Sequence, residues 1–149
     1  MPYEIEFVNR QTAISCDEEE ILRAASAVLA GEQIASAEIS LCVVDDGAIH
    51  ELNRQYLQHD YPTDVISFIL SHEQGHLDGE VIASAETAER ESKRLGWATE
   101  AELLLYLVHG LLHLCGYDDR DPAALARMRE KERHYLSLLG HTARYDEPA

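Results

Sequence analysis

Residues 103–119 run Leu-Leu-Leu-Tyr-Leu-Val-His-Gly-Leu-Leu-His-Leu-Cys-Gly-Tyr-Asp-Asp and hold the strongest structural signal in the chain. The first part is almost wholly apolar, which predicts a buried helix ending near Leu114. Thr99, with Glu102 three residues later, has the spacing of a capping box and is expected to begin that helix. Gly116 can take the left-handed conformation that ends a helix. The stretch therefore predicts a core helix followed by a sharp turn.

Two histidines interrupt this apolar helix. His109 and His113 are four residues apart, so a helix places both imidazoles on one face, one turn apart. Two neutral imidazoles form half of a tetrahedral zinc site, and a turn at Gly116 could bring Asp119 back as a third ligand. A bare histidine pair at this spacing is more often two partly buried side chains. The glycine and the acidic residue at these offsets favour a metal held by His109, His113 and Asp119.

The same pattern argues against a protease. Metalloproteases with two histidines at this spacing have a glutamate directly after the first one, and it acts as the general base. That position is Gly110 here, so peptide hydrolysis is disfavoured. Asp118 and Asp121 are alternative third ligands in the same turn.

The remaining segments predict a layered α/β or α+β domain with a four-stranded mixed sheet and about five helices. No repeat or Pro/Gly-rich linker divides the chain, so a single domain is expected over residues 1–149. Asp17 is expected to cap an acidic first helical turn. Strands are expected over 3–8, 37–44, 64–70 and 80–84, helices over 21–30, 45–57, 85–95, 99–114 and 122–139, and a polar loop over 71–79.

Charge and composition bear on the partners. The 149 residues include 12 Lys and Arg against 28 Asp and Glu, which gives a net charge of −16. Such a surface repels nucleic acid and anionic membranes unless a local basic patch or a metal cation offsets it. The N-terminus has no signal-peptide pattern, and the longest apolar run is too short to span a membrane. Cys16, Cys42 and Cys115 are interpreted as buried thiols of a reducing compartment, so a soluble cytoplasmic protein is expected.

Residues 109–119 resemble the HGxLHLxGYDH signature of the YbeY endoribonuclease family, in register from His109 to Asp118. Residues 52–68 resemble the family's LNxxYRxxDxPTDVLSF segment, and residues 77–84 are similar to its LGDIxIS strand. The resemblance implies a zincin-like fold, one catalytic zinc ion and a hydrolase specific for single-stranded RNA. It also implies a role in ribosomal RNA maturation and ribosome quality control, with the ribosome or small-subunit proteins as partners.

Two departures from the family pattern affect the expected chemistry. Asp119 stands where the family has a third histidine, and two imidazoles with one carboxylate could also admit iron or manganese. Leu57 replaces an arginine that the resemblance links to catalysis or RNA binding. Arg54, one helical turn earlier, is the candidate substitute, and His59 is a candidate general base by its proximity to the motif.

Two other functions stay open at this point. The chain could be a non-catalytic, ribosome-associated zinc-binding module, or a metal-dependent hydrolase of another substrate. Arg90, Lys93 and Arg94 are interpreted as a solvated helix face, with an RNA contact as the alternative. His72 and His76 are interpreted as solvated residues of a polar loop that could reach the metal site.

Overall fold

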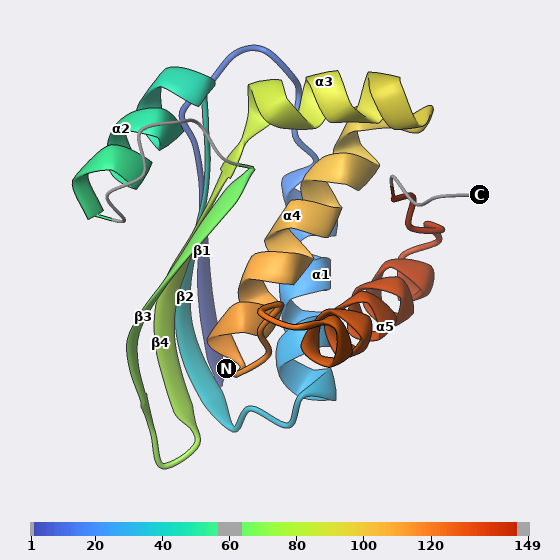
Figure 1. Ribbon diagram of the computed structural model, residues 1–149. Helices are drawn as coiled ribbons and strands as arrows, with labels where there is room; N and C mark the ends of the chain where they lie inside the picture. The colour runs from blue at the N-terminus through green and yellow to red at the C-terminus, as the bar shows by residue number, and fades with distance from the viewer. Residues whose placement is uncertain (1, 57–63, 146–149) are drawn as a thin grey trace.

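The computed structural model describes residues 2–56 and 64–145, and these form a four-stranded sheet with five helices (Figure 1). The predicted mixed sheet and helix number are therefore confirmed. The elements in chain order are β1 (Tyr3–Asn9), α1 (Glu18–Gly31), β2 (Ser36–Val44), α2 (Asp46–Tyr56), β3 (Val65–Glu73), β4 (His76–Ser84), α3 (Ala85–Leu95), α4 (Thr99–Leu114) and α5 (Pro122–Leu138).

The strand order is β1-β2-β4-β3. β1, β2 and β4 run parallel, and β3 pairs antiparallel with β4 at the edge of the sheet. Parallel neighbours need long crossovers, and α1 lies in the connection between β1 and β2. Because β3 is at the edge, one side of this strand has no neighbouring strand in the described sheet. α4 packs against β3 as well as against β4.

The expected polar loop over residues 71–79 is wrong. β3 extends to Glu73 and β4 begins at His76, so only Gln74 and Gly75 connect them. Both residues have positive φ, 53° and 81°, as tight hairpin turns require. A polar stretch can form this two-stranded ribbon, because the hydrogen bonds between the strands of a hairpin join backbone groups and do not depend on the side chains.

The helices cover the two faces of the sheet unequally. α1 and α4 pack on one face, α5 lies outside them, and α2 lies on the other face (Figure 1). The main core lies between the sheet and α1 and α4, where Leu41, Val81 and Leu111 are almost fully buried. A smaller cluster forms where Ile49 of α2 packs against Ile66. α4 is thus the central helix, and 12 of its residues are buried.

The predicted capping box at the start of α4 is wrong. The N-cap residue is Ala98, which makes no side-chain cap hydrogen bond. The Thr99 hydroxyl instead bonds to the Ser92 hydroxyl at 2.9 Å, and Glu102 accepts a hydrogen bond of 2.7 Å from Trp97 Nε1. Tertiary partners on the preceding turn therefore outcompete the local cap.

Two further expectations can be compared with the described residues. None of their helices is both long and apolar enough to cross a membrane. Cys16, Cys42 and Cys115 are free thiols. Burial raises the pKa of each thiol, that of Cys115 to about 12. A thiol is a nucleophile only as a thiolate, so these cysteines are poor nucleophiles.

Candidate metal centre

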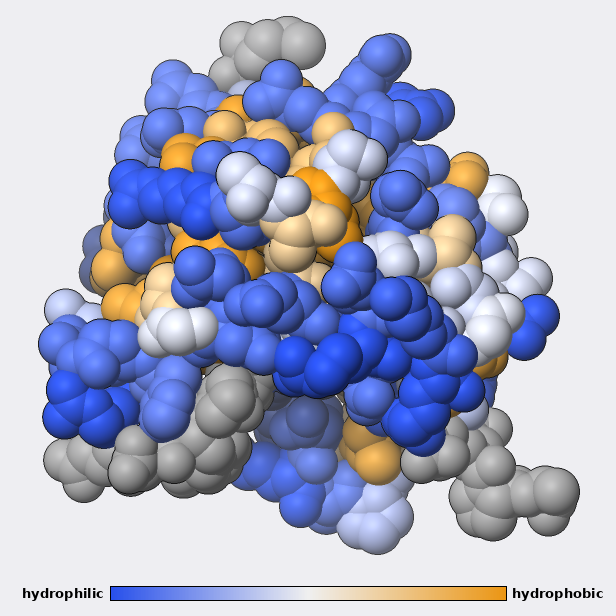
Figure 2. Space-filling view, turned by 90° about the horizontal axis from the view of Figure 1, so that it is seen from above, coloured by the Kyte–Doolittle hydropathy of each residue, from blue (hydrophilic) through white to orange (hydrophobic). Residues whose placement is uncertain are grey.

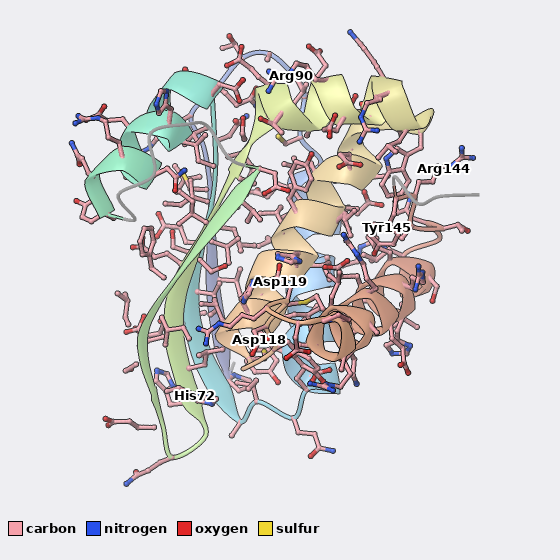
Figure 3. All side chains as sticks on the ribbon, in the orientation of Figure 1. His72, Arg90, Asp118, Asp119, Arg144 and Tyr145 are labelled. Carbon is pink, nitrogen blue, oxygen red and sulfur yellow. The ribbon has the colours of Figure 1, made fainter. Side chains whose placement is uncertain are left out.

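The three predicted ligands converge at the end of α4. Gly116 has φ of +108°, and the Tyr117 N–H donates to the Leu112 carbonyl at 3.0 Å, which closes the helix and reverses the chain. Asp119 then lies beside the two imidazoles, with Oδ2 3.6 Å from His109 Nε2 and Oδ1 3.9 Å from His113 Nε2. One ligand atom from each of the three lies within 4.8 Å of the others. Figure 3 shows Asp119 beside α4.

The two alternative acids in this turn have other hydrogen bonds. Asp118 Oδ1 accepts from the Arg120 N–H at 3.2 Å. Asp121 caps α5 and accepts from the Ala124 N–H at 2.8 Å. Neither belongs to the metal-capable group found among the described residues, so the geometry favours Asp119 as the third ligand.

A buried glutamate orients His109 from behind. Glu132 of α5 has no exposed surface, and its Oε2 lies 2.6 Å from His109 Nδ1. Its Oε1 accepts hydrogen bonds from Arg129 at 3.1 Å and from the Tyr145 hydroxyl at 2.6 Å. A carboxylate on one ring nitrogen fixes the tautomer, so that His109 Nε2, on the Asp119 side, keeps its lone pair.

The two imidazoles differ in their electrostatics. Burial alone would lower the pKa of His109, but the hydrogen bond and charge of Glu132 outweigh burial, and the pKa is raised. Burial and the neighbouring His109 lower the pKa of His113. The rings lie 4.8 Å apart between centroids. Two close imidazoles cannot both be protonated without repulsion, and a bound cation would use their lone pairs and pair with the negative charge of Asp119.

The residues present fit a divalent cation. Ligand atoms about 2.0–2.1 Å from one tetrahedral ion lie roughly 3.4 Å from each other. The separations of 3.6 and 3.9 Å run to the two different oxygens of Asp119, and one ligand atom from each of the three residues lies within 4.8 Å of the others, so small side-chain rotations would bring them to this spacing. Nitrogen and oxygen donors with an orienting carboxylate behind one histidine are typical of transition-metal sites. The three side chains would leave a fourth position facing a cleft.

The close packing of α4 against the sheet explains why position 110 is glycine and not the glutamate found in metalloproteases. A Cβ at this position would lie 2.4 Å from Val81 Cγ1, so α4 can approach the sheet only with glycine there. The Ser67 hydroxyl of β3 donates to the Gly110 carbonyl at 3.0 Å. This bond and the close approach fix the distance between the histidines and the edge strand.

The cleft between β3 and α4 has a volume of about 380 Å³ and includes all three candidate ligands. Asp64, just before β3, also lines it. The Asp64 charge is among the causes that raise the pKa of His109, which places its carboxylate within electrostatic reach of the metal centre. Asp64 Oδ1 accepts from the Val65 N–H at 2.8 Å. Sequence reasoning quoted Asp64 only as part of a motif and missed its position in the cleft.

The other candidate residues lie elsewhere. Arg54 is 53% exposed on α2, is ion-paired with Glu51, and does not line the cleft. His59 and Leu57 lie outside the described residues. His72 is exposed towards the hairpin, well away from Asp119 (Figure 3). His76 Nδ1 lies 2.7 Å from the Ser36 hydroxyl, between neighbouring strands, so the structure does not bring either hairpin histidine to the metal site.

Comparisons with known proteins give consistent matches. A family model described as "Endoribonuclease YbeY" matches residues 6–140. The protein of that name from Rhodopirellula baltica is 42% identical over 123 residues, which are 81% of this chain and 63% of the relative. The endoribonuclease YbeY of Chloroflexus aurantiacus is 36% identical over 151 residues, which are 94% of this chain and 97% of the relative. The solution structure of TM1509 from Thermotoga maritima has a TM-score of 0.62 and 27% identity, covering 89% of this chain and 87% of that one.

Proposed function

The chain belongs to the endoribonuclease YbeY family, and from this premise we propose that it is a metal-dependent endoribonuclease acting on single-stranded RNA. The observation that supports the proposal is the convergence of His109, His113 and Asp119 in a cleft that is open on one side. Structural zinc sites are closed by four protein ligands, whereas catalytic sites keep a position for water or substrate. A group of three ligands beside a cleft therefore favours catalysis over the non-catalytic module.

We propose zinc as the ion, because the family resemblance implies it; iron or manganese would also suit two imidazoles and one carboxylate. When bound, such an ion lowers the pKa of a coordinated water and polarises a phosphoryl oxygen. His109, His113 and Asp119 would hold the ion. Glu132, through the hydrogen bond to Nδ1, would keep His109 in the tautomer that binds it.

Within this proposal, Asp64 is the proton acceptor. Its carboxylate lines the same cleft as the three ligands, and the Val65 N–H holds one oxygen in place. A positioned carboxylate within reach of the reacting group can take the proton of the attacking group as the bond to phosphorus forms, while the bond from phosphorus to the leaving ribose oxygen breaks and that oxygen takes a proton from water. This assignment replaces His59, for which only motif proximity argued.

The cellular setting follows from the family resemblance. We propose that the substrate is ribosomal RNA and that the enzyme acts in its maturation and in ribosome quality control, in the cytoplasm. The ribosome or its small-subunit proteins would be the partners. The single-domain organisation over residues 1–149 is part of the same proposal.

The test is cleavage of a labelled single-stranded RNA by protein treated with a chelator and then restored with zinc. We expect about one ion per chain, cleavage of single strands in preference to duplex, and loss of both metal and activity in His113→Ala. Asp64→Asn keeps the acceptor for the Val65 N–H, so it should keep the metal but lose most of its turnover. Asp78→Asn, on the opposite face of the sheet, is the control.

Three results would contradict the proposal. Cleavage that survives complete metal removal would exclude a metal-dependent mechanism. Metal-loaded protein that cleaves no RNA would favour the non-catalytic module. Full activity of Asp64→Asn would exclude Asp64 as the proton acceptor while leaving the metal centre intact.

A further inference from the structure

A second, larger cleft adjoins the metal centre. Its volume is about 970 Å³, and it shares Asp64, His109 and Asp119 with the smaller cleft. α4 forms its floor, because Glu102, Tyr106 and His109 lie at helical spacing on one face. α3 and α5 form its walls. From Glu102 to His109 the floor runs about 10 Å, so this groove extends along α4 away from the candidate ligands.

Five arginines of the described segments line this groove. Arg90 and Arg94 lie four residues apart on α3, and Arg129 and Arg133 lie four apart on α5, so each wall presents two guanidinium groups on one helix face. Arg144, in the segment after α5, is the fifth. They are five of the 12 basic residues in the whole chain. Figure 3 shows Arg90 above and Arg144 at the side of this region, and Figure 2 looks down on the strongly hydrophilic α3 end.

Among the described residues, the acids that line the groove equal its arginines in number, but they are not equally exposed. Two of the five acids that line it, Glu102 and Glu132, are buried, with 4% and 0% of their surface exposed. A third, Asp119, is a candidate metal ligand. The remaining two acids are Asp64 and Glu91, and Glu91 is ion-paired with Arg94 at 2.9 Å. Five arginines against five acids give a neutral lining in a chain of net charge −16, and a bound divalent cation would make it positive.

Several of these arginines are held in place by their neighbours. Arg90 donates to Asp46 Oδ2 at 2.6 Å, and Asp46 Oδ1 accepts from the Ser84 hydroxyl at 2.5 Å. The guanidinium groups of Arg129 and Arg133 lie 4.0 and 5.1 Å from the centroid of the Tyr145 ring. Side chains that are already ordered lose less entropy when a ligand binds.

We propose that this arginine-lined groove binds the backbone of the single-stranded RNA that flanks the cleaved bond. The inference rests on the proposed function, because the groove opens onto the metal centre of that function. Guanidinium forks match phosphate geometry, and planar guanidinium and tyrosine groups offer stacking surfaces to unpaired bases. The groove supplies cations that the loss of the family arginine at Leu57 removes. If the groove binds RNA in this way, Arg90 and Arg94 contact the RNA and are not simply solvated residues of a helix face.

The experiment removes one exposed arginine from each wall in the double variant Arg94→Gln and Arg133→Gln. The matched control is Arg127→Gln, because Arg127 lies on α5 but lines a different hollow. The probe is a fluorescein-labelled oligouridylate of about 12 nucleotides, the length range that extended single-strand sites cover. Fluorescence anisotropy measures its binding to zinc-loaded protein in the Asp64→Asn background, in which turnover is expected to be slow, and cleavage is followed separately in zinc-loaded protein that keeps Asp64.

We expect the double variant to bind this probe at least about tenfold more weakly than the control. The slope of log affinity against log salt should fall by about 1.4, since each phosphate contact to a single strand contributes about 0.7. Cleavage of a dinucleoside monophosphate, whose single phosphate is the one that is cleaved, should fall less than cleavage of the 12-nucleotide probe. The single variants Arg94→Gln and Arg133→Gln give the same comparison if the double variant melts early.

The outcomes separate this inference from the proposed function. Equal binding and equal salt slopes for variant and control, beside a wild type that cleaves RNA, would overturn the groove and leave the function standing. Binding by the groove without any cleavage would support the groove and contradict the function. Stronger binding of polyglutamate than of oligouridylate, lost in the double variant, would assign the groove to an acidic protein and overturn the inference.

Discussion

Replacement of Glu132 by glutamine tests whether the buried carboxylate controls metal binding through His109. The carboxylate accepts hydrogen bonds from three groups: His109 Nδ1, Arg129 and the Tyr145 hydroxyl. Glutamine keeps one acceptor oxygen and places an NH₂ donor where an acceptor is needed. If this NH₂ faces Nδ1, the imidazole proton moves to Nε2, the atom that must bind the ion.

The magnitude follows from these contacts. Loss of a carboxylate behind a ligating histidine typically costs 10- to 100-fold in metal affinity, or about 1.4–2.7 kcal/mol. Stability should fall as well, because hydrogen bonds to charged groups are worth about 1.5–3 kcal/mol each. Arg129 is 34% exposed and can turn to solvent, which limits the total loss to about 3 kcal/mol. A chain of this length would then melt roughly 6–12 °C lower.

The assay is zinc titration against a competing chelator, with thermal melting of the metal-free and metal-loaded forms. Glu130→Gln is the matched control, since Glu130 is exposed on the same helix. We expect the control to match wild type in both measurements. A well-folded Glu132→Gln protein with wild-type zinc affinity would refute the argument, because His109 would then hold its tautomer without the carboxylate.

Three further predictions concern single residues. Asp119→His should keep the metal and raise the preference for zinc over manganese in elemental analysis after mixed loading; full affinity in Asp119→Ala with loss in Asp118→Ala would show a different third ligand. Gly110→Ala should destabilise by about 1–3 kcal/mol in denaturant unfolding, because the new methyl group would lie 2.4 Å from Val81 Cγ1. Burial raises the pKa of Glu102, so the favourable contribution of Glu102 to stability is lost as pH rises through its folded-state pKa. Glu102→Gln should therefore be more stable than wild type at neutral and alkaline pH, by about 1.4 kcal/mol per unit of pKa shift, and should differ little at acidic pH. An equal gain in stability at all pH values would contradict this cause.

Sequence predicted the part of the site that local geometry determines. His109 and His113 share a helix face because their spacing matches the helix period, and Gly116 lies at the turn that returns Asp119. Each step spans only a few residues, so no knowledge of the packing was needed. The same holds for Asp17, which caps α1 by accepting from the Glu20 N–H as expected.

The residues that sequence reasoning missed depend on tertiary packing. Glu132 lies 23 residues after His109 and meets it only because α5 packs against α4. A signal was present, since Glu132 lies between Met128 and Leu136 on the apolar face of α5, where a carboxylate is out of place unless paired. Asp64 had no such signal, because an aspartate before a strand has an ordinary role in turns.

The wrong predictions share one physical cause: local patterns were interpreted without their tertiary partners. The spacing of Thr99 and Glu102 matches a cap, but Ser92 and Trp97 bind these side chains instead. The stretch from 71 to 79 is polar, yet it forms the end of β3 and the start of β4, and the antiparallel pairing of these two strands keeps it extended. The catalytic role of Arg54 stays a prediction; on α2 its guanidinium pairs with Glu51.

The net charge of −16 is a poor guide to whether the protein binds nucleic acid, because it averages over two differently charged sides of the molecule. Glu4, Glu38 and Asp78 are direct neighbours across three parallel strands, on the sheet face turned away from α4. Like charges in such a row cost stability, and they repel an approaching polyanion from that face. The arginines gather instead on the α3 and α5 walls beside the metal centre. If the groove binds RNA as proposed, then with a cation bound at the metal centre a strand would be repelled by this acidic row and attracted at the groove, and the excess of acid would orient the strand.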